Sequence, residues 1–462
     1  MERGDNTQTS LSNPRTKIKQ TPCQNFALAL PPLLALCEGR KRRAAFPAGT
    51  FLPSRRFNGA MRVSQYVNLR PGMTAPLWLT LLLGVLTAVG PVSTDMYLPA
   101  FPLIEADFGG HAGSAQITLA AWFIGLAIGQ ITHGSLSDRF GRRAPLMLGT
   151  LLYAAASAGC ALAPGLWTFS LCRVLAAIGG SASMVVPRAV VRDLTDGHEA
   201  ARMLSRLMLV MGVVPILAPA AGGAVLAIAG WRLIFWIATF YGAVSAVLVW
   251  RFLPDTLAQN RRIRLGPLGL LARYAQIARE PRFVTNALCG GFAMAGLFAY
   301  LGGSPAAYIS QYRVTPAHYG MLFGANAAGF IFSAQINARL LPRFGTDRVI
   351  NTAVAMAVLA TFLLTLDAFT LWGHVPGLAL PLFLFLASLG FLMPTTTVGA
   401  LSRHAAQAAS ASALMGTGQF LLGALFSTAV GLLNDGTARP MALLMLAASL
   451  GALLAGLARP RG

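Results

Sequence analysis

Apolar stretches long enough to cross a lipid bilayer recur from Leu77 to the end of the chain. A hydrocarbon core of roughly 30 Å requires about 20 consecutive, mostly apolar residues in a helix. Twelve stretches meet this requirement, with approximate spans 77–99, 115–135, 145–163, 166–187, 204–226, 231–252, 283–304, 317–338, 349–369, 376–397, 409–430 and 438–457. Soluble domains contain about 25% charged residues, whereas this chain contains 11%. We therefore expect an all-α integral membrane protein with twelve transmembrane helices.

Residues 1–72 differ in composition from the rest of the chain. They hold its three lysines, Lys17, Lys19 and Lys41, and the basic run RKRR at residues 40–43. Such a segment cannot bury enough apolar surface to fold, so we expect a disordered basic extension that transport does not need. A basic arm that binds lipid or nucleic acid is the alternative. The net charge of +21 does not by itself require a nucleic-acid partner, and we expect none.

The arginines are distributed unevenly between the loops. One alternating set of loops contains Arg139, Arg142, Arg143, Arg188, Arg192, Arg202, Arg206, the cluster between Arg251 and Arg282, Arg339, Arg343, Arg348 and Arg403. The opposite set contains Arg232, Arg313 and Arg439. Cytoplasmic loops carry the excess of basic residues. The sequence thus predicts a multi-pass membrane protein with both termini in the cytoplasm.

A long basic connection and a short repeat divide the helices into two sets of six. The connection covers residues 253–282, and RFG at residues 139–141 returns as RFG at 343–345, in each case after the second helix of a set. Two related halves with a site between them are typical of transporters. We expect two pseudo-symmetric six-helix bundles, 73–252 and 283–462, joined by a cytoplasmic linker.

The loop after the second helix reads GSLSDRFGRR, residues 134–143. Its glycines permit a tight turn and close approach of helices, and its aspartate can face the arginines or the positive end of a neighbouring helix. The candidate functional residues of this turn are Gly134, Asp138, Arg139, Gly141, Arg142 and Arg143. A loop that only sets membrane orientation would explain the arginines, but not Asp138 or the glycines.

Two charged residues lie within predicted spans, where a charge costs roughly 2.5–3.5 kcal/mol on insertion scales. Asp95 ends the apolar part of the first span, in GPVSTDMYLPAFP. Facing a partly dry cavity, its charged form is disfavoured, so it is a candidate proton carrier; capping the outer end of the helix is the alternative. Arg173 lies in the fourth span, in LCRVLAAIGGSAS. It is a second candidate functional residue, which should have a partner inside the protein, and the alternative is that it extends to the outer headgroups.

The fifth span contains GVVPILAPAAGG, residues 212–223. Pro215 and Pro219 are expected to bend this helix, and Gly222 and Gly223 to let another helix pack closely against it. A purely architectural role for this bent helix is the alternative to a role in transport.

These motifs resemble those of a known family. The loop at 134–143 is similar to the signature of the major facilitator superfamily at every defined position, and DMYLPAFP, RAVVRDL and ARMLSRLMLVMGVVPILAP resemble the bicyclomycin and chloramphenicol resistance (Bcr/CflA) family of drug:proton antiporters. The resemblance covers about residues 77–459. It implies the major facilitator fold in a bacterial inner membrane, a latch at 134–143 that holds the cytoplasmic side closed in one state, a proton-coupling role for Arg173 and an antiporter helix at 212–223. Ala176, Ala218 and Thr87 depart from the family pattern.

The sequence therefore predicts a proton-coupled multidrug efflux transporter that works by alternating access. We expect small-molecule drugs as substrates, protons as the coupling ion, no other cofactor or metal, and a monomer in the bilayer. Export of one metabolite, such as a sugar or an amino acid, and symport are the alternatives. An enzyme is disfavoured because no nucleophile motif, phosphate loop or metal-ligand spacing occurs. Candidates for the cavity walls are Tyr97, Trp122, Phe123, Tyr300, Asn326 and Gln419.

Overall fold

The computed structural model describes residues 77–460, apart from gaps at 111–112, 196, 258–266, 372 and 405–406. The chain divides into two units, 1–59 and 60–462, and all described residues lie in the second. The predicted basic extension, residues 1–72, lies outside the described residues.

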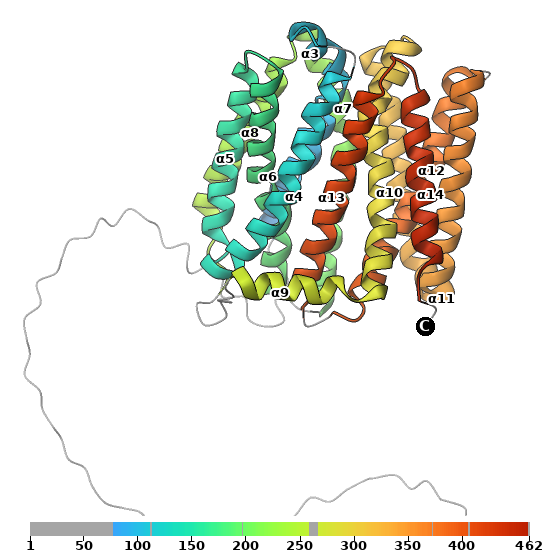
Figure 1. Ribbon diagram of the computed structural model, residues 1–462. Coiled ribbons are helices and arrows are strands. Elements are labelled where there is room, and N and C mark those ends of the chain that lie inside the picture. Colours follow the sequence, from blue (N-terminus) through green and yellow to red (C-terminus); the bar gives the residue numbers. More distant parts are fainter. Residues whose placement is uncertain are drawn as a thin grey trace, which may run out of the picture. The chain divides into compact units, whose positions relative to one another are not determined.

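The described part of the chain is helical and contains no strand (Figure 1). Its helices are α1 (Leu77–Thr87), α2 (Val89–Asp95), η2 (Leu98–Ala100), α3 (Phe101–Asp107), α4 (Ser114–Phe140), α5 (Arg143–Leu162), α6 (Leu166–Leu194), α7 (Gly197–Ile228), α8 (Arg232–Phe252), α9 (Pro267–Ala278), α10 (Pro281–Pro305), η4 (Ala306–Gln311), α11 (Pro316–Thr370), α12 (His374–Leu401), α13 (Ala408–Leu432) and α14 (Arg439–Leu457).

The predicted twelve spans are present in this order. Ten helical segments of the described chain are long and apolar enough to cross a bilayer. One of them, within α11, is interrupted at Gly345, whose φ of 74° and ψ of 165° are not helical, so that α11 consists of two spans. The remaining span is α7, whose apolar part is Val213–Ile228. The fold class is thus confirmed, while the domain boundaries at residues 252 and 283 stay a prediction.

The first span is longer than predicted and is built from short pieces. It runs from Leu77 to Asp107 rather than ending near residue 99. Because proline lacks a backbone N–H, the sequence at Pro99 and Pro102 passes through the 3₁₀ turn η2 before α3 begins. Asp95, the last residue of α2, is therefore well inside the span, and the alternative that it caps the outer end of the first helix is wrong.

The two sets of helices meet through close backbone contacts at the end of the bundle that carries α3, which we call the α3 end; the opposite end, which α9 crosses, is the α9 end (Figure 1). A Cβ atom added at Gly113 would lie 2.0 Å from the carbonyl oxygen of Gly431, and one at Gly320 would lie 2.8 Å from the Cα of Ala220. The Gln116 amide donates to the Gly302 carbonyl at 3.0 Å. These contacts close the α3 end.

Gly222 brings α7 against the first span. A Cβ atom there would lie 1.9 Å from the carbonyl oxygen of Met96. Only glycine fits at this position, and the first span packs closely against it. Helix α7 continues through Pro215 and Pro219, and Pro219 and Gly223 are buried.

We expect Gly222→Ala to lower the melting temperature of the purified protein, because overpacking against backbone costs about 1–3 kcal/mol. The matched control is Gly456→Ala in α14, where an added Cβ would meet nothing within 4 Å and helix propensity improves by up to about 1 kcal/mol. Thermal unfolding followed by tryptophan fluorescence measures both. Equal melting temperatures for the two variants would contradict the close contact at Met96.

Candidate functional site

A cavity of about 220 Å³, which we call the central cavity, lies between helices of both halves. Four of the residues predicted for proton coupling or the cavity walls line it, namely Asp95, Trp122, Phe123 and Tyr300. Phe123 stacks on Phe298 with ring centroids 3.7 Å apart. Aromatic and aliphatic side chains make up most of the wall, so the central cavity suits apolar or amphipathic molecules.

Asp95 is the one carboxylate among the described residues that line the central cavity. Its side chain is 5% exposed, and within the described part of the chain no arginine or histidine forms an ion pair with it. A buried carboxylate without a cation is costly while it is charged. It can therefore accept either a proton or a cationic ligand.

Arg173 is buried against aromatic side chains and, unlike Asp95, does not line the central cavity. Its guanidinium carbon is 4.3 Å from the ring centroid of Tyr97 and 4.5 Å from that of Trp122, a cation–π arrangement. Its Nη1 donates to the carbonyl of Ser93 at 3.0 Å, on the same helix as Asp95. The side chain is 2% exposed, so the alternative that Arg173 extends to the headgroups is wrong. Tyr97 packs around this arginine and does not line the central cavity.

Two polar candidates lie beside the central cavity and not on its wall. The Nδ2 of Asn326 donates to the Tyr300 hydroxyl at 3.1 Å, so this buried amide orients a tyrosine that does line the cavity. Gln419 belongs to α13 and faces α10, where its Nε2 would be 3.3 Å from a Cβ atom at Gly290. Neither side chain is among those that line the cavity in the described structure.

Three methionines that sequence reasoning did not select line the central cavity, namely Met184, Met211 and Met294. Methionine is flexible and polarizable, so it adapts to ligands of different shape. Pro215 of α7 also lines the cavity, which places the predicted antiporter helix next to the site. The sequence signal for them is the recurrence of methionine within the apolar spans four, five and seven.

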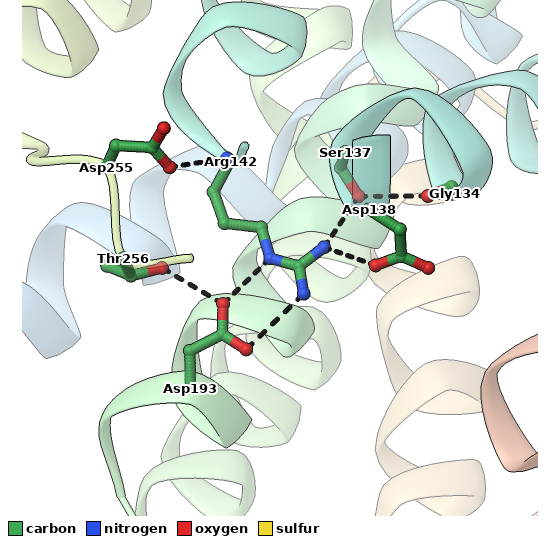
Figure 2. Close-up of polar contacts among 7 residues, drawn as sticks. All are labelled: Gly134, Ser137, Asp138, Arg142, Asp193, Asp255 and Thr256. Carbon is green, nitrogen blue, oxygen red and sulfur yellow. Dashed lines mark hydrogen bonds and ion pairs between the residues drawn. The ribbon is translucent and has the colours of Figure 1, made fainter. Parts of the chain in front are cut away.

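The loop at 134–143 holds a buried arginine at the α9 end, shown in Figure 2. The Nε and Nη2 of Arg142 donate to both oxygens of Asp193, at 2.7 and 3.3 Å, and Nη1 donates to Asp138 at 2.6 Å and to the Ser137 hydroxyl at 3.0 Å. The Thr256 hydroxyl donates to Asp193 at 3.1 Å. We call these contacts, with Asp255, the Arg142 network.

Electrostatics and backbone geometry both fix the Arg142 network. Burial alone would lower the pKa of Arg142. Hydrogen bonds and charges from Asp193 and Asp138 raise it by more than burial lowers it, so the net shift of the pKa is upward and the arginine stays charged. Its backbone N–H donates to Asp255 at 2.8 Å. Gly141 has a φ of 92°, and a Cβ atom there would lie 2.0 Å from the Asp255 carboxylate. Glycine is therefore required at this turn.

The other members of the predicted latch take different places. Arg139 is exposed beside Phe140, Arg143 donates to the Trp250 carbonyl, and the Gly134 carbonyl accepts from Ser137 at 3.1 Å. Asp193 and Asp255 were not predicted, although Asp193 stands in the quoted motif RAVVRDL. Within the described residues, no group of His, Cys, Asp and Glu could hold a metal ion.

Comparisons with known proteins agree with this architecture. The sequence profile of the Major Facilitator Superfamily matches residues 83–428. An uncharacterized MFS-type transporter of Bacillus subtilis, YdgK, is 35% identical, with 80% of this chain and 92% of the relative covered. A bicyclomycin resistance protein homolog of Haemophilus influenzae (78% and 90% covered) and a chloramphenicol resistance protein of Pseudomonas aeruginosa (78% and 85% covered) are each 28% identical.

Solved structures show the same fold at low sequence identity. The inward-facing, occupied structure of a bacterial homolog of the human lysosomal transporter Spinster has a TM-score of 0.65 at 15% identity, and covers 83% of this chain and 96% of its own. The partially occluded, inward-open xylose transporter XylE from E. coli has a TM-score of 0.64 at 16% identity, and covers 82% and 96%. Together with the sequence profile and the relatives, these structures show that the chain is a multi-pass membrane transporter and belongs to the Major Facilitator Superfamily.

Proposed function

We propose that this protein exports amphipathic drugs across the bacterial inner membrane in exchange for protons. The observation that carries this proposal is Asp95, which among the described residues is the one carboxylate at the wall of a mainly apolar and aromatic cavity and has no arginine or histidine as an ion-pair partner. The names of two relatives, resistance proteins for bicyclomycin and chloramphenicol, support a drug as the substrate.

One carboxylate is sufficient to couple two ligands. A charged Asp95 in the central cavity is stabilised by a cationic drug, and in the absence of the drug it is stabilised by taking up a proton. The two ligands then compete for one site, so that binding of one requires release of the other. That competition is the minimum requirement for exchange.

Alternating access requires that the two ends of the bundle open in turn. The excess of arginine at the α9 end supports a cytoplasmic location for that end. In the proposed cycle, the contacts at Gly113 and Gly320 separate so that the drug leaves at the α3 end. At the α9 end, the Arg142 network holds the ends of the N-terminal helices together in one of the two states.

Export of a single metabolite is less well supported by the site. A sugar needs several precisely placed hydrogen-bonding groups, whereas the central cavity offers Asp95, Thr94 and Tyr300 among mainly apolar side chains. The likeness to the xylose transporter concerns the fold alone.

Uptake of a fluorescent monovalent cationic drug into inverted vesicles tests the proposal. Exchange of one proton for one such cation moves no net charge, so we expect accumulation to need an acidic lumen and to survive collapse of the membrane potential. A gradient of one pH unit supplies about 1.4 kcal/mol, which limits accumulation to about tenfold. Vesicles without the protein are the control. Accumulation that follows the potential and ignores the pH gradient would contradict this exchange.

A further inference from the structure

A second hollow, larger than the central cavity, lies at the α9 end of the C-terminal half. Its volume is about 510 Å³, and its walls come from the two helices of α11 on either side of Gly345 and from Phe391 of α12. We call it the α11 groove. Leu340, Phe344 and Met356 supply its apolar surface, while Arg348, Asn351 and Thr352 supply its polar groups.

The polar side of the α11 groove carries an excess of positive charge. Arg348 is exposed, and among the described residues no carboxylate pairs with it. The nearby acid, Asp347, is paired with Arg459 at 3.2 Å. Arg459 also donates to the Oδ1 of Asn351 at 2.6 Å, which fixes the orientation of that amide. The Thr352 hydroxyl donates to the Arg348 carbonyl at 2.9 Å, so the groove presents an unpaired cation and an amide donor next to an apolar wall.

The internal repeat shows how unusual this surface is within the fold. Aligned on RFG, the N-terminal half reads RFGRRAPLMLGTLL and the C-terminal half RFGTDRVINTAVAM. Ala144 and Leu148 stand where the C-terminal half has Arg348 and Thr352. Leu148 is 68% exposed on the outer surface of the helices, as expected for a side chain that faces lipid tails. The C-terminal half therefore carries polar groups on a surface that is apolar in its counterpart.

The α11 groove faces the hydrocarbon region of the bilayer. Phe344, on its wall, is 51% exposed, and further along the same helical element Leu359 and Phe362 are 58% and 55% exposed. Large exposed apolar side chains along a transmembrane helix mark the surface in contact with lipid. A ligand of this groove must therefore have an anionic head at the depth of Arg348 and an apolar tail.

We propose that the α11 groove binds one anionic phospholipid of the leaflet at the α9 end. Its phosphate accepts charge-assisted hydrogen bonds from Arg348 and a hydrogen bond from the Asn351 amide, and the first part of an acyl chain packs against Leu340, Phe344 and Phe391. Basic pockets between transmembrane helices are a general mode of anionic lipid recognition. This site is separate from the central cavity and does not depend on the proposed transport function.

Native mass spectrometry of the purified full-length protein tests this site. Titration compares phosphatidylglycerol with phosphatidylcholine of the same acyl chains. We expect phosphatidylglycerol to bind with 1:1 stoichiometry at low concentration, and Arg348→Ala to weaken that binding about fivefold. Alanine is the residue at the counterpart position of the N-terminal half, so the fold tolerates it there.

Arg279→Ala is the matched control, because Arg279 is exposed at the same end of the bundle, outside the α11 groove, and the variant has the same change in charge. We expect its affinity for phosphatidylglycerol to stay within twofold of that of the unaltered protein. Three outcomes would overturn the proposal: equal binding of phosphatidylcholine, an equal loss of affinity in Arg279→Ala, or displacement of the lipid by glycerol 3-phosphate at equal concentration, which would show that a free phosphate is the ligand.

Discussion

Asp95→Asn is expected to abolish drug accumulation driven by a pH gradient in inverted vesicles. Asparagine has nearly the shape of aspartic acid but cannot take up or release a proton, so the competition between proton and drug is lost. The protein should still insert and fold, because an uncharged side chain is less costly than a carboxylate in the central cavity. Binding of neutral drugs should remain.

Two further variants separate the charge of Asp95 from its position. Asp95→Glu keeps a titratable carboxylate on a longer side chain and should retain partial efflux. Asp107→Asn is the matched control, since Asp107 belongs to the same span but pairs with Arg232 outside the central cavity, and we expect normal efflux from it. If Asp95→Asn still concentrates drug against a gradient, the proton site lies elsewhere in the protein.

Asp193→Asn is expected to reduce efflux about tenfold or more, and more strongly than Asp138→Asn. Asp193 accepts two bonds from Arg142 and is 17% exposed, whereas Asp138 accepts one and is 36% exposed. Removing one partner of a buried pair costs about 3–5 kcal/mol, while an exposed pair contributes about 0.2–1 kcal/mol. A tenfold change in rate needs only about 1.4 kcal/mol.

Initial rates of drug uptake at matched protein levels measure this difference. Arg142→Lys should behave like Asp193→Asn, since lysine cannot form the forked contact with both Asp193 oxygens. Asp107→Asn again serves as the control for loss of one acidic charge. Equal efflux from Asp193→Asn and the unaltered protein would limit the loop to setting membrane orientation.

The sequence allowed the transmembrane helices, and the charged residues within them that are functional candidates, to be predicted, because both predictions follow from the free-energy cost of transfer into lipid. A run of apolar residues must span the bilayer as a helix, and a residue such as Asp95 within it needs a functional reason. The direction in which a side chain points was harder to predict. A helix that is apolar all round gives no periodic signal, so nothing in the sequence distinguished Trp122, which lines the central cavity, from Gln419, which does not.

The partners of Arg142 could not be predicted for a different reason. Asp193 and Asp255 are 51 and 113 residues away from it in the chain. They approach it only after α4, α5, α6 and α8 have packed together. The loop motif indicated that an arginine would find a carboxylate, and the obvious one was Asp138, four residues earlier. Contacts between distant segments require the tertiary fold.

The glycine contacts at the α3 end have a consequence for how the two ends respond to solution conditions. Gly113 meets Gly431 and Gly320 meets Ala220 through uncharged backbone, so these surfaces separate without breaking an ion pair. Their separation should hardly depend on ionic strength. At the α9 end, Asp138 is partly exposed to solvent, and its attraction for Arg142 weakens as salt shortens the Debye length from about 10 Å at 0.1 M to about 3 Å at 1 M. High salt should therefore weaken this one contact of the Arg142 network and leave the glycine contacts of the α3 end unchanged.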